Sequence, residues 1–157
     1  MPDPIVESAR WAAGQGFDTL RRAVRDLPAA ALNWRPASPG DTNSIAVLTT
    51  HAAHATRVLL SMAAGLPAPA RDRAGEFAAV AEGPEALLAL VDTLGAECDA
   101  ILEGCAGMDW GTLRQRRRDD GSVAEMPAVQ ALLLALVHLH GHADEAALSR
   151  HFWLAQA

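Results

Sequence analysis

Hydrophobic residues return every three or four positions in four long stretches of this chain, which is the spacing of one buried face of an α-helix. The clearest stretches are residues 44–65, 84–104 and 126–152, and a looser stripe runs over residues 4–26. Four amphipathic helices of similar length bury their apolar faces most simply against one another. The pattern therefore predicts an all-α fold, a four-helix bundle.

Residues at the edges of these stretches agree with helix boundaries. Pro4 and Pro84 stand where the first turn of a helix tolerates proline. Asn43 or Ser44 provides a side chain that can cap the start of the second helix, and Gly65 is suited to its end. We therefore expect helix ends close to these positions.

The connections differ in character. Residues 28–43 contain three prolines, and we expect Leu32 and Trp34 to pack this connection onto the helices. The next connection is expected to hold one helical turn around residues 76–80. Residues 107–126 alternate apolar and polar positions, which indicates either a short hairpin or an ordered loop before the last helix.

Composition supports one helical domain over residues 1–157. Half of the residues are hydrophobic, but the chain has only three Phe, four Trp and no Tyr, which favours helices over strands. A chain of 157 residues buries enough surface to fold without disulfides or metal. The formal net charge of −6 would repel a phosphate backbone, so we expect no nucleic-acid partner.

The chain offers no signal for export or membrane insertion. The most apolar stretch, residues 129–139, is about half as long as a membrane-spanning helix must be. Cys98 and Cys105 lie seven residues apart in a helical stretch, a separation at which they do not pair easily, and we expect them to be reduced. These features predict a cytoplasmic protein with no membrane partner.

Histidines supply the candidate chemistry. The chain has six of them: His51, His54, His138, His140, His142 and His151. His138 and His142 lie one turn apart on one helical face, so both rings can approach one ion at about 2.0–2.1 Å. His51 lies at the centre of the apolar stripe of the second helix. The three residues together predict one divalent metal ion shared by two helices; the alternative is core histidines paired by ordinary hydrogen bonds.

Other residues near these positions are weaker candidates. His54 lies at the edge of the second-helix stripe, where it would be a fourth ligand or a partner that orients the site. Glu145 follows His142 by three residues and would act as a weak ligand or general base, unless it is simply solvated. His140 should point to the surface, opposite His138, and His151 falls in the fraying end of the last helix.

A cluster of arginines precedes the last helix. Four arginines lie between residues 114 and 118, and Asp119 and Asp120 follow them directly. Arg117 and Arg118 are candidates for binding an anionic substrate or the carboxylates of a thiol cofactor. The alternative is a solvated loop whose charges balance locally.

Two segments resemble one known family. Residues 32–36 (LNWRP), a short turn and residues 43–46 (NSIA) leading into His51 resemble the second-helix signature of DinB-like proteins. The last helix resembles the final motif of the same family, with a methionine-proline start, His138, three residues, His142 and then an arginine. This superfamily includes the YfiT-like metalloenzymes.

The resemblance implies a four-helix bundle over essentially the whole chain, often as a homodimer. It also implies one divalent metal ion held by a histidine of the second helix and two of the last, which correspond to His51, His138 and His142. Members with known activities are similar to transferases and isomerases that use low-molecular-weight thiols, and others are described as metal-dependent hydrolases.

The first hypothesis is therefore a metal-dependent enzyme with an open three-histidine site, zinc or nickel being the favoured ions. It would act on a small molecule, either as a hydrolase or as a transferase or isomerase that uses a low-molecular-weight thiol. The second hypothesis is a non-catalytic module that binds a metal or a small molecule. The third is a metal-free helical interaction domain.

Overall fold

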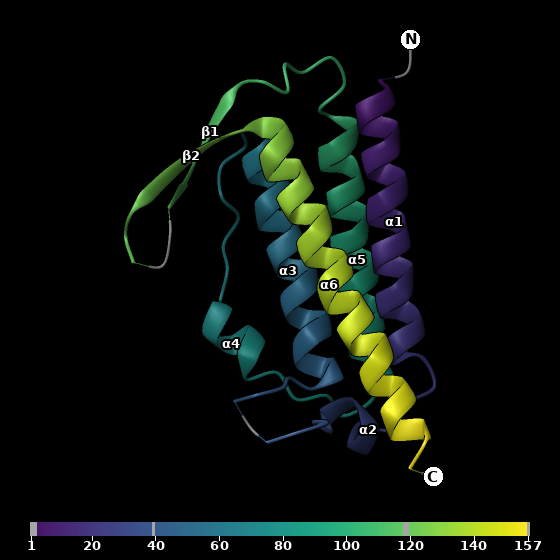
Figure 1. Cartoon of the computed structure of the whole chain (residues 1–157). Helices are drawn as coiled ribbons and strands as arrows, with labels where there is room; N and C mark the ends of the chain where they lie inside the picture. The colour runs from purple at the N-terminus through teal and green to yellow at the C-terminus, as the bar shows by residue number, and fades with distance from the viewer. Residues whose placement is uncertain (1–2, 39, 118–119, 157) are drawn as a thin grey trace.

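The computed structural model describes residues 3–38, 40–117 and 120–156, and it is mostly helical (Figure 1). The helices are α1 Pro4–Val24, α2 Ala29–Asn33, α3 Ile45–Ala64, α4 Arg73–Phe77, α5 Pro84–Glu103 and α6 Ala128–Leu154, and the strands are β1 Leu113–Arg117 and β2 Val123–Pro127. The prediction of a predominantly helical fold is confirmed, and the segment before the last helix is a hairpin.

The four long helices α1, α3, α5 and α6 lie side by side (Figure 1). Helix α6 packs against α3 and α1, and α5 packs against the same two helices from the other side. The core fills the space between the four, with fully buried side chains that include Leu20, Ile45, Leu60, Leu102 and Leu139. The sequence pattern predicted this role for the four long segments, since each is apolar along at least one face.

The ends of the helices follow the local signals. Ser44 caps α3, and its hydroxyl accepts a hydrogen bond from the backbone N–H of Val47 at 3.3 Å. Gly65 ends α3 with φ of +75°, a left-handed conformation that glycine adopts without a Cβ penalty. Helix α4 begins at Arg73, three residues before the predicted turn, because the side chain of Asp72 caps it.

Helix α6 is covered on two sides, by α3 and by α1. The prediction that His140 lies on the surface is wrong, because its ring is half-buried against α1 and Nε2 donates to the carbonyl of Ala12 at 2.9 Å. The close approach of the two helices depends on Gly16, where an added Cβ would lie 2.7 Å from the Leu139 side chain.

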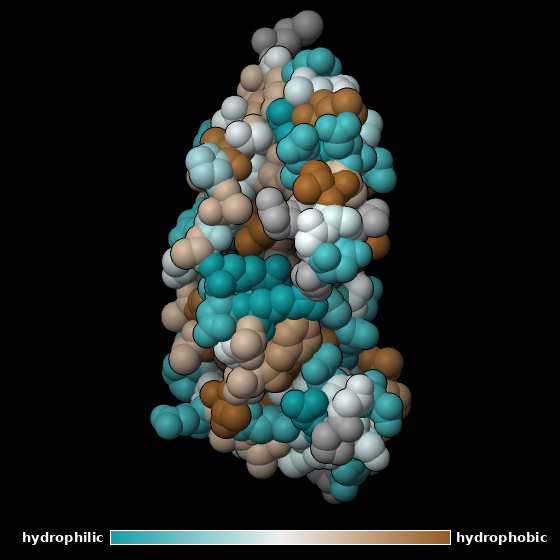
Figure 2. Space-filling view, turned by 90° about the vertical axis from the view of Figure 1, so that its left-hand side faces the viewer, coloured by the Kyte–Doolittle hydropathy of each residue, from teal (hydrophilic) through white to brown (hydrophobic). Residues whose placement is uncertain are grey.

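The hairpin and α4 lie outside the four long helices, on one side of the molecule (Figure 1). Strands β1 and β2 pair antiparallel, with Leu113 opposite Pro127 and Arg117 opposite Val123. Hydrophilic side chains gather across the middle of the face on which α4 and the hairpin lie (Figure 2). No helix in the described part of the chain combines the length and the apolar character needed to cross a membrane.

Candidate metal centre

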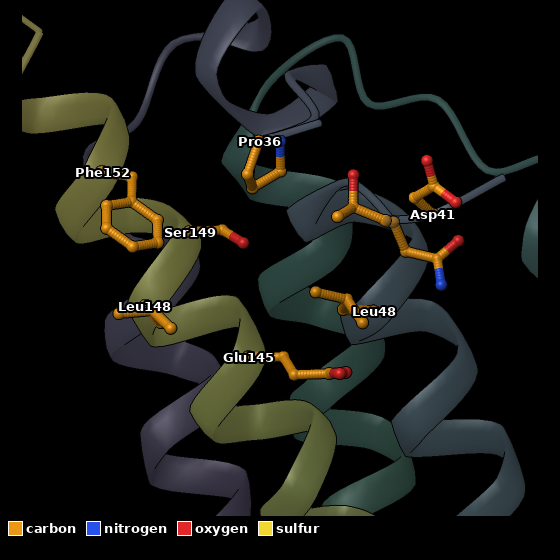
Figure 3. Close-up of a pocket in the computed structure, with 9 residues that line it drawn as sticks. Pro36, Asp41, Leu48, Glu145, Leu148, Ser149 and Phe152 are labelled. Carbon is orange, nitrogen blue, oxygen red and sulfur yellow. The ribbon is translucent and has the colours of Figure 1, made fainter. Parts of the chain in front are cut away.

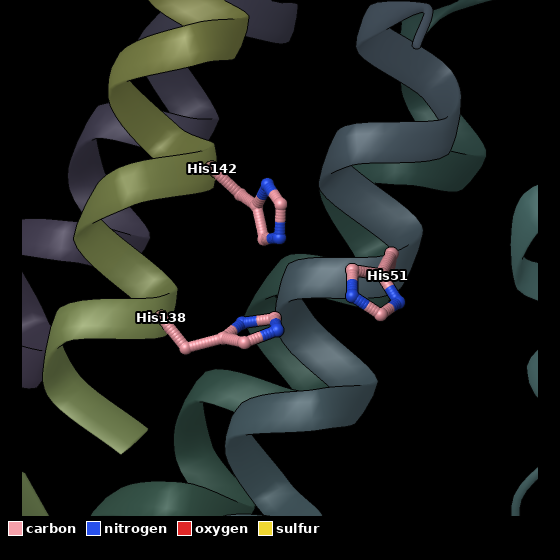
Figure 4. Close-up of side chains that lie close together, drawn as sticks. All are labelled: His51, His138 and His142. Carbon is pink, nitrogen blue, oxygen red and sulfur yellow. The ribbon is translucent and has the colours of Figure 1, made fainter. Parts of the chain in front are cut away.

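Three histidine rings meet between α3 and α6. His51 comes from the middle of α3, and His138 and His142 come from successive turns of α6, which is the helix that packs most closely on α3. The ring centroid of His51 lies 5.0 Å from that of His138 and 5.1 Å from that of His142. The centroids of the His138 and His142 rings lie 4.6 Å apart. The rings are turned toward one another across the space between the helices (Figure 4).

This geometry suits a shared metal ion. One ligand nitrogen from each ring lies within 4.8 Å of the other two, close enough for the three histidines to bind one ion. In a tetrahedral site with bonds of about 2.0–2.1 Å the nitrogens lie roughly 3.4 Å apart, so small side-chain rotations would bring all three onto one ion. His51 is buried and both α6 rings are half-exposed, so the cluster is accessible from one side.

A buried carboxylate lies behind His51. Oε2 of Glu76, on α4, lies 2.9 Å from Nδ1 of His51, and the Glu76 side chain is only 3% exposed. An ionised carboxylate can only accept hydrogen bonds, so Nδ1 carries the proton and Nε2 keeps a lone pair for a metal ion. Nη2 of Arg71 also lies 3.3 Å from Nδ1, but the shorter contact with Glu76 determines the tautomer.

Glu76 is held in its charged form by Arg71. The guanidinium binds the carboxylate through two hydrogen bonds, Nε to Oε1 at 2.6 Å and Nη2 to Oε2 at 2.7 Å. Burial acts to raise the pKa of Glu76, but the hydrogen bonds from Arg71 and His51 outweigh it and leave the pKa below its ordinary value. Arg71 and Glu76 thus form a charged support that orients the His51 ring.

Glu145 contacts His142 in the same way that Glu76 contacts His51, through Nδ1 of the ring. Its Oε2 lies 2.7 Å from Nδ1 of His142, so the other ring nitrogen is again the one available to a metal ion. The Glu145 side chain is 59% exposed, in contrast to the buried Glu76. The structure therefore places Glu145 beside a candidate ligand, as the spacing suggested, and its function as ligand or base stays a prediction.

His138 differs from the other two rings. Its Nδ1 is buried and has no hydrogen-bond partner in the described part of the chain, an arrangement that costs free energy in a folded protein. Burial, with smaller contributions from nearby His142, His51, Arg71 and Arg116, lowers the pKa of His138 to about 4. Burial also lowers the pKa of His51 despite the Glu76 carboxylate. Both rings are consequently neutral near pH 7, the form that binds metal.

The structure does not assign a role to the other predicted site residues, His54, Arg117 and Arg118. His54 is half-buried on α3 and is not part of the three-histidine group, and burial lowers its pKa. Its predicted role stays a prediction. Arg117 ends β1 but its side chain is outside the described atoms, and Arg118 lies outside the described residues, so the predicted anion site is not tested.

Sequence reasoning did not identify Arg71 or Glu76 as part of the centre. Both lie in or next to a five-residue helix within a connection rich in proline and charged residues, which the pattern predicted only as one helical turn. The available signal was Asp72, since an N-cap there starts a helical turn that places Glu76 on the same short segment as Arg71.

Comparison with known proteins bears on this centre directly. The family model for the DinB superfamily matches residues 13–146, a range that includes all three clustered histidines. Comparisons with curated proteins and with solved structures returned no match. The family match covers most of the 157 residues. The chain belongs to the DinB superfamily.

Proposed function

We propose that this chain is a metal-dependent enzyme built on a four-helix bundle, in which His51, His138 and His142 hold one divalent ion, zinc or nickel by preference. The observation that carries the proposal is the approach of one nitrogen from each ring to within 4.8 Å of the others. Carboxylates that orient two of the rings strengthen it, since such partners are typical of metal-binding histidines.

Three protein ligands leave a coordination position free, as catalytic sites require. A divalent ion held there would lower the pKa of a bound water or thiol. The chain itself contributes three imidazoles, two carboxylates that orient two of them, and a half-exposed approach along α6. The reaction is either hydrolysis of a small molecule or transfer or isomerisation with a low-molecular-weight thiol.

A thiol, if used, must come from outside the chain. Cys98 and Cys105 are both free and both buried. Burial raises the pKa of Cys98 to about 12 and also raises the pKa of Cys105, so neither forms a thiolate readily. Two buried, unpaired cysteines also suit the cytoplasmic location that we propose.

The direct test is the metal content of protein purified without an affinity tag, measured by elemental mass spectrometry. We expect about one divalent ion per chain in the parent and a loss of the ion in His51→Ala and in His142→Ala. His151→Ala is the matched control, because His151 is exposed on the last turn of the same helix as His142. A parent that stays metal-free after incubation with zinc, nickel and manganese would overturn the proposal.

A second candidate is a non-catalytic module in which the ion ties α3 to α6. It is favoured by one observation, that the clustered histidines come from both of these helices. A structural ion would make chelation lower the melting temperature strongly, because its binding free energy contributes to folding. A small decrease in the melting temperature on chelation favours the enzyme. In that case the apolar core between the helices, which consists of side chains alone, holds the fold together without the ion.

The homodimer and the small-molecule substrate that we predicted are part of the same proposal and rest on the resemblance. Gel filtration with light scattering tests for the homodimer. A screen of esters, amides and electrophiles with added thiols tests for the small-molecule substrate. The metal-content experiment comes before both, because it determines whether the site exists.

A further inference from the structure

A pocket of about 220 Å³ lies between the same two helices that carry the three histidines. On α3 it is lined by Leu48, three residues before His51. On α6 it begins at Glu145, three residues after His142 and hydrogen-bonded to that ring. Because α3 and α6 run in opposite directions, both walls extend from the histidines toward the same end of the bundle (Figure 1). The pocket therefore adjoins the proposed metal centre.

The walls of the pocket are largely apolar. Leu48 comes from α3, Leu148 and Phe152 come from α6, and Pro36 comes from the connection that precedes α3 (Figure 3). Leu148 and Phe152 are about half-exposed, so part of their apolar surface is accessible to a ligand. A protein cavity of about 150 Å³ holds a benzene molecule, so the pocket has room for one aromatic ring with a short substituent.

Ser149 supplies a polar group on the buried wall of the pocket. The residue is only 5% exposed, and its hydroxyl makes no hydrogen bond within the described part of the chain. The hydroxyls of Thr50 and Thr56 on α3 donate instead to the carbonyl four residues earlier. Figure 3 shows the Ser149 hydroxyl pointing from α6 toward α3, into the pocket. A buried hydroxyl without a partner costs free energy, which a ligand with a hydrogen-bonding group would recover.

Charges of both signs border the pocket. Glu145 is already bonded to His142, and Asp41 is exposed to solvent. The Arg35 guanidinium donates to the carbonyl of Thr42, which also lines the pocket. The divalent ion of the proposed centre would add positive charge beside them. A charged ligand group would lose hydration here without a counter-charge of its own, so the surroundings favour an uncharged ligand.

We propose that this pocket binds one end of the substrate of the metal centre, and that this end is an uncharged apolar group with a hydroxyl or carbonyl. The polar atom bonds to the Ser149 hydroxyl, and the hydrocarbon part packs on Leu48 and Leu148. Ser149 follows His142 by seven residues, about 10 Å along a helix, so the substrate is an elongated molecule whose other end reaches the ion. This inference rests on the proposed function, since it names the substrate class of that same centre.

The test is an NMR titration of isotope-labelled protein with benzyl alcohol, toluene, benzylamine and benzenesulfonate near pH 7. Ser149→Ala should weaken binding of benzyl alcohol about three- to tenfold, the contribution of one neutral hydrogen bond, and leave binding of toluene unchanged. Ser61→Ala is the matched control, a buried serine near the opposite end of α3 and outside the pocket lining, and it should change neither affinity. Both charged probes should bind the parent at least about tenfold more weakly than benzyl alcohol.

Equal effects of Ser149→Ala on benzyl alcohol and toluene, a charged probe that binds as tightly as benzyl alcohol, or no binding of benzyl alcohol would overturn the inference. Phenylbutyrohydroxamic acid tests the connection to the centre, because its hydroxamate binds metal ions. In protein that holds metal it should displace benzyl alcohol, whereas acetohydroxamic acid, which lacks the ring, should not.

Metal content measured on the same preparations separates this inference from the proposed function. A parent that holds metal but in which phenylbutyrohydroxamic acid does not displace benzyl alcohol refutes the substrate class alone. A parent that holds no metal refutes the metal centre, and the Ser149→Ala titration then decides the ligand class of the pocket by itself.

Discussion

Replacing Glu76 with glutamine tests whether the buried carboxylate behind His51 controls metal affinity. Glutamine keeps the shape of the side chain but removes the charge that accepts two hydrogen bonds from Arg71. The amide can also present its N–H₂ group to Nδ1 of His51, which favours the opposite tautomer and takes the lone pair away from Nε2. The substitution therefore changes the orientation and the tautomer of a ligand without touching the ion.

The magnitude follows from the burial of this group. Loss of an outer hydrogen-bond partner of a metal-bound histidine typically lowers metal affinity about 10–100-fold, which corresponds to roughly 1.4–2.7 kcal/mol. The free energy of unfolding should fall by about 1–3 kcal/mol, because a charged hydrogen-bonded group is lost at a side chain that is 3% exposed. Arg71 moderates the loss, since its side chain is 22% exposed and can be hydrated.

The assay is a competition titration of zinc between the protein and a chromogenic chelator, performed well below the melting temperature of each variant. Glu97→Gln is the matched control, because Glu97 makes a half-exposed ion pair with Arg57 at 3.0 Å and such pairs contribute little. The control should keep the parent affinity. An unchanged zinc affinity in folded Glu76→Gln would refute the orienting role of the carboxylate.

Two further predictions concern the fold. Gly16→Ala should destabilise the protein by about 1–3 kcal/mol, since the new Cβ would lie 2.7 Å from Leu139. Gly14→Ala, with nothing within 4 Å of the added Cβ, should instead stabilise it by about 0.5–1 kcal/mol; equal effects in chemical unfolding would contradict the close packing of α1 on α6. Cys98 should resist alkylation at pH 8 in the native protein, because burial raises its pKa to about 12, and should react in denaturant. Rapid native labelling followed by peptide mass spectrometry would show that this reasoning fails.

The sequence was informative where the signal was local or repeated with the period of a helix. Ser44 and Gly65 delimit α3 as expected because capping depends on only a few neighbouring residues. The convergence of His51 with His138 and His142 also followed from spacing, since residues on the inward faces of two long, packed helices lie opposite one another. Helix periodicity thus predicted the central part of the candidate site.

The parts that the sequence did not predict depend on contacts between distant segments. The exposure of His140 could not be derived from α6 alone, because it depends on α1 covering that side of the helix. The contact of Glu76 with His51 joins residues 25 positions apart through a connection without a periodic pattern. Such a loop takes its conformation from the surface on which it folds, and no single-segment pattern encodes that surface.

The placement of His138 and His142 on adjacent turns of one helix has a consequence for how bound metal would stabilise the protein. Two ligands only four residues apart remain near each other when the chain is denatured, whereas His51 becomes separated from them. The denatured ensemble would therefore retain some affinity for the ion, and any affinity for that ensemble subtracts from the gain in native stability. The rise in melting temperature with added metal should accordingly underestimate how tightly the folded centre holds its ion.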